Sequence, residues 1–108
     1  MNWGGVSLKT LTICGSMRFE KEMQRIAWDL ETKYGYNVLQ CIYGFGEGMI
    51  SEKEIDRLVA AHFRKIDLSD GIYVVDIDGY IGESVKREIA YAKDSGKNIL
   101  YHSKFAMK

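Results

Sequence analysis

The stretch IYVVD, residues 72–76, decides the fold class, because an apolar run without polar alternation leads directly into a carboxylate. Ile72, Val74 and Val75 are β-branched, and the Asp70-Gly71 pair before them is a turn signal. An almost continuously apolar strand is typical of a parallel sheet that helices cover on both faces. We therefore predict a central strand here.

Other strand-like runs flank this one and alternate with helical patterns. The runs are LKTLTIC at 8–14, closed by Gly15, YNVLQC at 36–41 and NILY at 98–101. The helical patterns run from near Arg18 to Gly35, from the capping-box pair Ser51 and Glu54 to Asp70, and from about Ser84 to Ser95. Strands that alternate with such helices form crossover units and hence a parallel sheet.

The first two helical patterns each carry an apolar stripe at helical spacing. In the first pattern the stripe comprises Phe19, Met23, Ile26, Ala27 and Leu30. In the second it comprises Ile55, Leu58, Val59, Phe63 and Ile66.

These elements predict an α/β fold, a small Rossmann-like (flavodoxin-like) doubly wound parallel sheet flanked by helices. We expect about four to five strands in the order 2-1-3-4, in a single domain over residues 1–108 with its core at about 8–103. Ligands of such folds bind beyond the C-terminal strand ends, where the strand order reverses. Here that point lies between the first and third strands, at loops 15–18 and 76–84.

Composition excludes several functional classes. The chain of 108 residues has 15 Lys and Arg against 15 Asp and Glu, so we expect no nucleic-acid surface. We expect no membrane span, because no apolar run approaches roughly 18 residues, and no secretory signal at the N-terminus. Cys14 and Cys41 lack the spacing of a zinc or redox pair, and we expect Cys14 to be a buried free thiol in the cytoplasm. His62 and His102 stand far apart without paired ligands, so we predict neither a metal site nor a cofactor.

The loop after the first strand has the composition of an anion site. Gly15 permits a tight turn, and the N–H groups after it suit a phosphate together with the Ser16 hydroxyl. Arg18 would add a charge-assisted hydrogen bond. The alternative is that Ser16 only caps the helix and that Arg18 is solvated.

Glu88 is the strongest candidate for chemistry. At about 100° per residue it shares the inner helix face with Val85 and Ala92. A buried carboxylate is costly unless a partner or the helix dipole stabilises it, so we expect Glu88 to face a cleft. The alternative is a stripe-edge residue paired with Lys86 or Arg87.

The loop before Glu88 supplies further polar and aromatic groups. Tyr80 can stack on a base or sugar, and Ser84 shares a helix face with Glu88. Turn formation is the alternative for Asp76 and Asp78, and helix capping for Ser84. The candidate residues of this loop are Asp76, Asp78, Gly79, Tyr80, Gly82 and Ser84. His62, beside Leu58 and Ile66 in the second stripe, is either a structural histidine or a residue that lines the same cleft.

Several motifs together resemble the nucleoside 2-deoxyribosyltransferase-like superfamily, which includes the 2'-deoxynucleoside 5'-phosphate N-hydrolases. They are GSMRF at 15–19, HFRKI at 62–66, Ser69-Asp70, GYIGES at 79–84, Glu88 and AYA at 90–92. The resemblance covers about residues 8–103. It implies a Rossmann-like homodimer that acts on a nucleoside or its 5'-monophosphate.

The resemblance implies that Glu88 is the nucleophile of N-glycosidic bond cleavage, through a covalent glycosyl-enzyme that water or a second base resolves. Gly15 and Ser16 match the family's first binding turn, and Ser84 lies near its 5'-phosphate loop. Gly82 stands where the family has Asp or Ser, and His62 where it often has a carboxylate. His62, Asp76 and Asp78 are therefore the candidates to assist the leaving base.

Two further expectations remain open. A non-catalytic nucleotide-binding or sensing module on the same fold is the alternative function. Because the chain is short for a nucleotide pocket, we expect a second subunit to complete the site through the second helix and the 42–50 loop.

Overall fold

The computed structural model describes residues 9–44 and 50–105. Part of the 42–50 loop, residues 45–49, lies outside the described residues. Within them the strands are β1 (Thr10–Gly15), β2 (Asn37–Leu39), β3 (Gly71–Val75) and β4 (Asn98–Tyr101). The α-helices are α1 (Glu20–Thr32), α2 (Glu52–Asp67) and α3 (Glu83–Asp94), and the short 3-10 helices are η1 (Met17–Phe19) and η2 (Ile77–Gly79).

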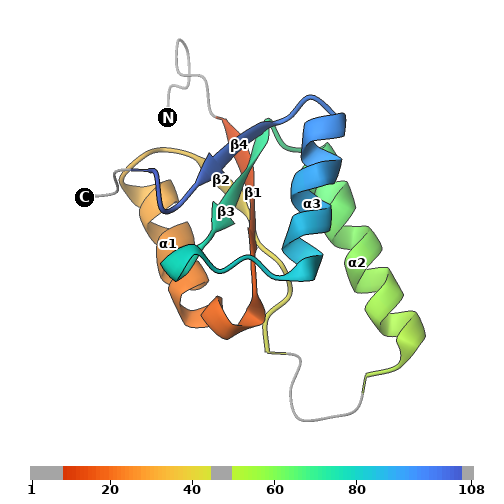
Figure 1. Cartoon of the computed structure of the whole chain (residues 1–108). Helices are drawn as coiled ribbons and strands as arrows, with labels where there is room; N and C mark the ends of the chain where they lie inside the picture. Colours follow the sequence, from red (N-terminus) through yellow and green to blue (C-terminus); the bar gives the residue numbers. More distant parts are fainter. Residues whose placement is uncertain (1–8, 45–49, 106–108) are drawn as a thin grey trace, which may run out of the picture.

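The strands of the described chain form one parallel sheet in the order β2-β1-β3-β4, which confirms the predicted fold class and strand order. Helix α1 covers one face of this sheet, and helices α2 and α3 cover the other (Figure 1). Strand β2 therefore lies on one side of β1, and β3 and β4 lie on the other. The strand order reverses between β1 and β3.

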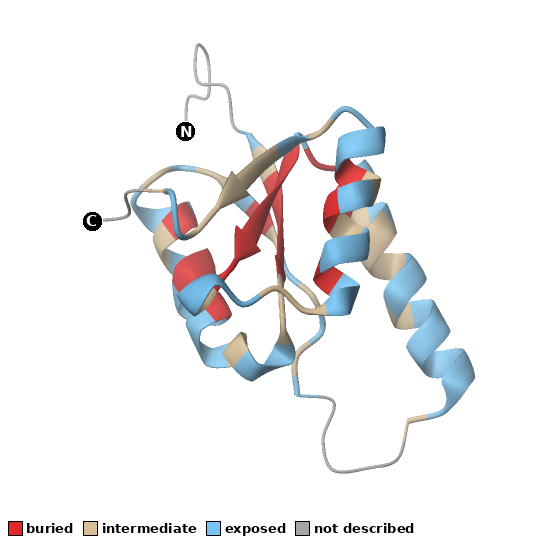
Figure 2. Cartoon of the chain, viewed as in Figure 1, coloured by how far each residue is buried: buried red, intermediate tan, exposed pale blue. Residues whose placement is uncertain are grey.

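Alternate residues of the central strands supply two separate cores. Leu11 and Ile13 of β1 pack under α1, whereas Cys14 packs with the α2 and α3 side. In β3, Tyr73 and Val75 belong to the α1 core. Every residue of β3 is buried, as the apolar run predicted, and the strand is red along its length in Figure 2.

Several element boundaries differ from the sequence prediction. Strand β2 spans three residues rather than 36–41, because among the described residues it is an edge strand that pairs with β1 alone, over Thr10–Thr12. Helix α1 begins at Glu20, after the 3-10 turn at Met17–Phe19. Helix α3 begins at Glu83, and Gly82 occupies its N-cap position.

Close packing explains the glycine at the end of β1. A Cβ atom on Gly15 would lie 2.9 Å from Met23 Sδ and 3.1 Å from Val75 Cβ. The residue therefore lets α1 approach the sheet, which is a stronger requirement here than the tight turn that the sequence suggested.

Helix α2 buries only part of its apolar stripe. Ile66 is buried, but Ile55 and Val59 are 44% and 49% exposed. The N-terminal half of α2 stands beyond the sheet, as its exposed turns in Figure 2 show. In the described part of the chain, no helix is both long and apolar enough to cross a membrane.

Candidate functional site

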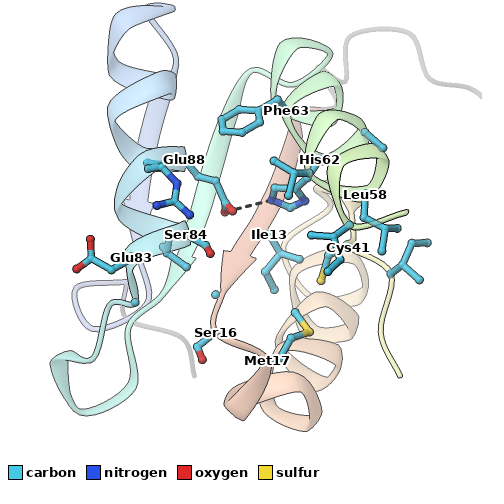
Figure 3. Close-up of a pocket in the computed structure, with 18 of the residues that line it drawn as sticks. Ile13, Ser16, Met17, Cys41, Leu58, His62, Phe63, Glu83, Ser84 and Glu88 are labelled. Carbon is cyan, nitrogen blue, oxygen red and sulfur yellow. Dashed lines mark ion pairs between the residues drawn. The ribbon is translucent and has the colours of Figure 1, made fainter. Parts of the chain in front are cut away.

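A pocket of about 480 Å³ opens at the strand-order reversal predicted for a ligand. Its floor includes Ile13 of β1, and its walls come from the loop after β1, the start of α3 and one face of α2 (Figure 3). The predicted residues Gly15, Ser16, His62, Tyr80, Gly82, Ser84 and Glu88 all line it. The topology thus brings together side chains from three separate parts of the sequence.

Glu88 and His62 face each other across this pocket. Glu88 Oε1 lies 3.2 Å from His62 Nε2, and the two side chains are 15% and 13% exposed. The dashed line in Figure 3 marks this pair. The expectation that Glu88 faces a cleft is confirmed, whereas the alternative partner Lys86 pairs with Glu83 instead.

The buried thiol of Cys14 lies beside the same imidazole nitrogen. Cys14 Sγ is 3.5 Å from His62 Nε2, and the ligand atoms of Cys14, His62 and Glu88 all lie within 4.8 Å of one another. We call these residues the Cys-His-Glu cluster. The sequence predicts no metal site. It does not reveal this cluster because the three residues are far apart in the sequence and close only in the folded chain.

The contacts of the imidazole favour one tautomer. An ionised Glu88 only accepts hydrogen bonds, so a proton on His62 Nε2 makes the 3.2 Å contact favourable. His62 Nδ1 is buried without a hydrogen-bond partner among the described residues. A neutral ring with its proton on Nε2 leaves Nδ1 as an acceptor, the less costly group to leave unpaired.

The electrostatic surroundings keep Cys14 protonated. Burial, followed by the neighbouring Glu88 carboxylate, raises the pKa of the Cys14 thiol well above its ordinary value. Burial also raises the pKa of Cys41, which is only half-buried at the pocket wall. Both cysteines are free thiols, and Cys14 is the buried one that the sequence predicts.

The residues after β1 combine capping with access to the pocket. Ser16 is the N-cap of η1, and its Oγ accepts a hydrogen bond from the Arg18 backbone N–H at 3.3 Å. The Arg18 guanidinium lies outside the pocket lining and stacks 3.8 Å above the Tyr80 ring. Arg18 therefore holds the Tyr80 ring beside the pocket. Ser16 both caps η1 and lines the pocket, so capping is not its only role as the alternative proposed.

Three predicted residues of the following loop lie outside the pocket. The buried Asp76 carboxylate accepts hydrogen bonds from the Ser103 backbone N–H at 2.8 Å and from the Ser103 hydroxyl at 2.6 Å. Asp78 and Gly79 have positive φ angles of 55° and 76°, so they form the turn itself. Asp76 thus holds the chain after β4, and the turn-forming alternative applies to Asp78.

The first turn of α3 lines the pocket and has no side-chain cap. Its N-cap residue, Gly82, offers no side-chain hydrogen bond to the first turn. Ser84 is exposed in that first turn and lines the pocket, so it is not the N-cap that the sequence allowed.

Sequence reasoning missed much of the apolar wall. These pocket residues are Met17, Cys41, Ile42, Ile50, Leu58, Val59 and Phe63. The available signals were the α2 stripe and the 42–50 loop, through which the sequence predicts that a second subunit completes the site. Arg87 also lines the pocket, although the sequence offered it only as a salt-bridge partner of Glu88.

Comparisons with protein-family models, with curated proteins and with solved structures gave no match.

Proposed function

We propose that the chain cleaves the N-glycosidic bond of a nucleoside or its 5'-monophosphate, with Glu88 as the nucleophile. The observation that carries this proposal is the Glu88 carboxylate, held against His62 on the wall of a pocket that also presents the Ser16 and Ser84 hydroxyls. A carboxylate that is only 15% exposed and lies 3.2 Å from an imidazole nitrogen has a restricted direction of attack.

The proposed reaction has two steps. Glu88 attacks the anomeric carbon, the bond to the base breaks, and a glycosyl ester forms. The base takes up a proton as it leaves. Water then cleaves the ester and releases the sugar, or a second base accepts the sugar and makes the reaction a transfer.

In this scheme His62 is a positioning residue. The nucleophile and acid carboxyl groups of retaining glycosidases stand about 5–5.5 Å apart. His62 Nε2 is only 3.2 Å from Glu88 Oε1, so it orients the nucleophile. With Asp76 bound to Ser103 and Asp78 in the turn, water in the pocket is the proposed proton source for the base.

The pocket chemistry supports a phosphorylated substrate. The uncapped first turn of α3 supplies backbone N–H donors, and the Ser84 hydroxyl lies in that same turn. Arg87 adds a cationic side chain to the lining. The apolar wall from α2 provides a surface for the base.

The test is release of free base from a panel of nucleosides and their 5'-monophosphates, followed by chromatography. Glu88→Gln keeps the side-chain shape and is expected to lower the rate by at least about 100-fold. Asp94→Asn is the matched control, because Asp94 is on the same helix but is exposed and lies outside the pocket lining. Equal rates for the two variants, or no release from any substrate, would overturn the proposal.

A nucleotide-binding module without turnover is the second candidate. The observation in its favour is that neither Asp76 nor Asp78 lines the pocket, which leaves the described lining without an aspartate. A ligand would then raise the melting temperature without forming product. A melting-shift screen with the same panel separates the two functions.

We also propose that a second copy of the chain covers the apolar pocket wall. Ile42, Ile55 and Val59 are about half exposed there, a costly arrangement for a monomer. Val59→Asp is expected to shift the mass measured by light scattering from dimer to monomer. Leu68→Asp, at the 77% exposed residue beyond the other end of α2, is the control that keeps the dimer.

A further inference from the structure

We propose that the Cys-His-Glu cluster binds a zinc ion through Cys14 Sγ, His62 Nε2 and a Glu88 carboxylate oxygen, and that zinc thereby inhibits the chain's activity. The inhibition rests on the proposed function, whereas the binding of zinc does not. No feature of the glycosidic reaction requires a buried thiol beside Glu88, so Cys14 is the part of the site that this reaction leaves unexplained.

The spacing of the three ligand atoms fits a tetrahedral ion. With Zn–S bonds of about 2.3 Å and Zn–N and Zn–O bonds of about 2.0–2.2 Å, neighbouring ligand atoms lie roughly 3.3–3.6 Å apart. Cys14 Sγ and Glu88 Oε1 lie 3.5 Å and 3.2 Å from His62 Nε2. The third pair, Cys14 Sγ and the Glu88 oxygen, lies within 4.8 Å, so these two ligand atoms must approach each other by about 1 Å before the cluster surrounds zinc.

The ligand types select zinc over the common hard cations. Thiolate and imidazole are ligands for zinc and later transition metals, whereas magnesium and calcium take oxygen ligands. His62 and Glu88 both line the pocket, so the fourth position of the ion would face the pocket and accept water. Three protein ligands and one open position make a site that small molecules can reach.

Zinc binding changes the protonation of both Cys14 and His62, and it breaks no described hydrogen bond of His62 Nδ1. Zinc binding needs the Cys14 thiolate and a free electron pair on His62 Nε2. The imidazole proton moves from Nε2 to Nδ1, where the buried N–H has no hydrogen-bond partner among the described residues, a cost that the bonds to zinc must offset. The thiol proton leaves to solvent, so one proton is released for each zinc bound.

Zinc and the sugar compete for the same carboxylate. Glu88 cannot attack an anomeric carbon with the electron pairs that bind the ion, and His62 can no longer orient it through Nε2. The expected consequence is that zinc inhibits base release and that a chelator restores it.

The binding test uses the metal-free chain and Co²⁺ as a spectroscopic probe for zinc. A thiolate-to-cobalt charge-transfer band in the near ultraviolet, displaced by Zn²⁺ and not by Mg²⁺, is expected. Cys14→Ala and His62→Gln should each weaken zinc binding by more than the roughly 10–100-fold typical of losing an outer-shell partner. Two variants are used because either one alone could perturb folding, and circular dichroism checks both.

The other cysteine gives the matched control. Cys41→Ala removes the half-buried thiol outside the cluster and is expected to keep the cobalt band. A wild-type chain without the band, or a band lost with Cys41 and kept without Cys14, would overturn the zinc site.

The inhibition test is separate from the binding test. Base release is measured with zinc and again after chelation, and each variant is compared with its own metal-free rate. Zinc is expected to slow the wild-type chain but not the Cys14→Ala variant. Bound zinc with unchanged or faster base release would overturn the inhibition. Should the panel show no base release at all, the proposed function fails while the cobalt experiment still decides the zinc site.

Discussion

Helices α1 and α2 carry similar apolar stripes but use them differently. In α1, Met23, Ile26, Ala27 and Leu30 are all buried against the sheet. In α2 the only fully buried residue is Ile66, near the C-terminal end. The remaining stripe residues of α2 include half-exposed isoleucine and valine side chains that line the pocket.

The position of each helix relative to the sheet explains the difference. Helix α1 lies along the sheet, whereas α2 extends past the C-terminal strand ends with its first turns (Figure 1). The end of the sheet is where ligands of such folds bind. An apolar stripe that continues beyond a sheet therefore indicates a binding wall or an interface between subunits.

The largest expected effect compares one truncation on each helix. Leu30 is fully buried, so Leu30→Ala should lower the free energy of unfolding by about 2–5 kcal/mol. Val59 is 49% exposed, and Val59→Ala in dilute protein should cost no more than about 0.5 kcal/mol. Urea denaturation of both variants measures the difference.

Protein concentration sharpens this comparison. If a second copy covers α2, the cost of Val59→Ala should grow as the protein concentration rises, because dimerisation stabilises the folded chain. Equal costs for Leu30→Ala and Val59→Ala in dilute protein would contradict the difference between the helices.

A second comparison concerns glycines on the two sides of the site. Gly15→Ala places a Cβ atom 2.9 Å from Met23 Sδ under α1 and should destabilise the fold by about 1–3 kcal/mol. Gly82→Ala meets Tyr80 Oη at an ordinary 3.5 Å and should cost less than about 0.5 kcal/mol. Thermal melts of the two variants provide the measurement, and a larger cost at Gly82 would show that the pocket side is the tighter one.

The sequence was sufficient for the fold because its local signals agree. The apolar run of β3 indicated a strand covered on both faces, and β3 is buried throughout. Ser51 and Glu54 form the predicted capping box. The inward direction of Glu88 also followed from helical periodicity alone, since its neighbours Val85 and Ala92 are buried.

The rest of the site depends on contacts that no local pattern encodes. Cys14 and His62 are separated by 48 positions, and only the crossing of β1 by α2 brings them together. Asp76 looked like a site carboxylate, but its partner Ser103 lies 27 positions later, after β4. Pairwise distance in space, rather than spacing in sequence, distinguishes the catalytic candidates from the structural ones.

A smaller effect is expected where α2 depends on its own cap. The Ser51 side chain accepts a hydrogen bond from the Glu54 N–H at 3.1 Å. Because the first turns of α2 bury little, this cap carries a large share of their local stability. Ser51→Ala should cost about 0.5–2 kcal/mol locally and speed hydrogen exchange in the first two turns of α2, with α1 unchanged. Equal exchange in both helices would contradict this.

The smallest expected effect is the pH dependence of the same cap. The Ser51 backbone N–H donates to Glu54 Oε1 at 2.9 Å, and this hydrogen bond lowers the pKa of Glu54. A folded-state pKa below the unfolded one stabilises the helix start above the unfolded pKa, and that stability is lost as the pH falls through the folded pKa. Exchange at the start of α2 should therefore accelerate in acid relative to α1, after correction for intrinsic rates. Glu54→Gln should remove this pH dependence, whereas Glu52→Gln, at the preceding exposed position, should keep it.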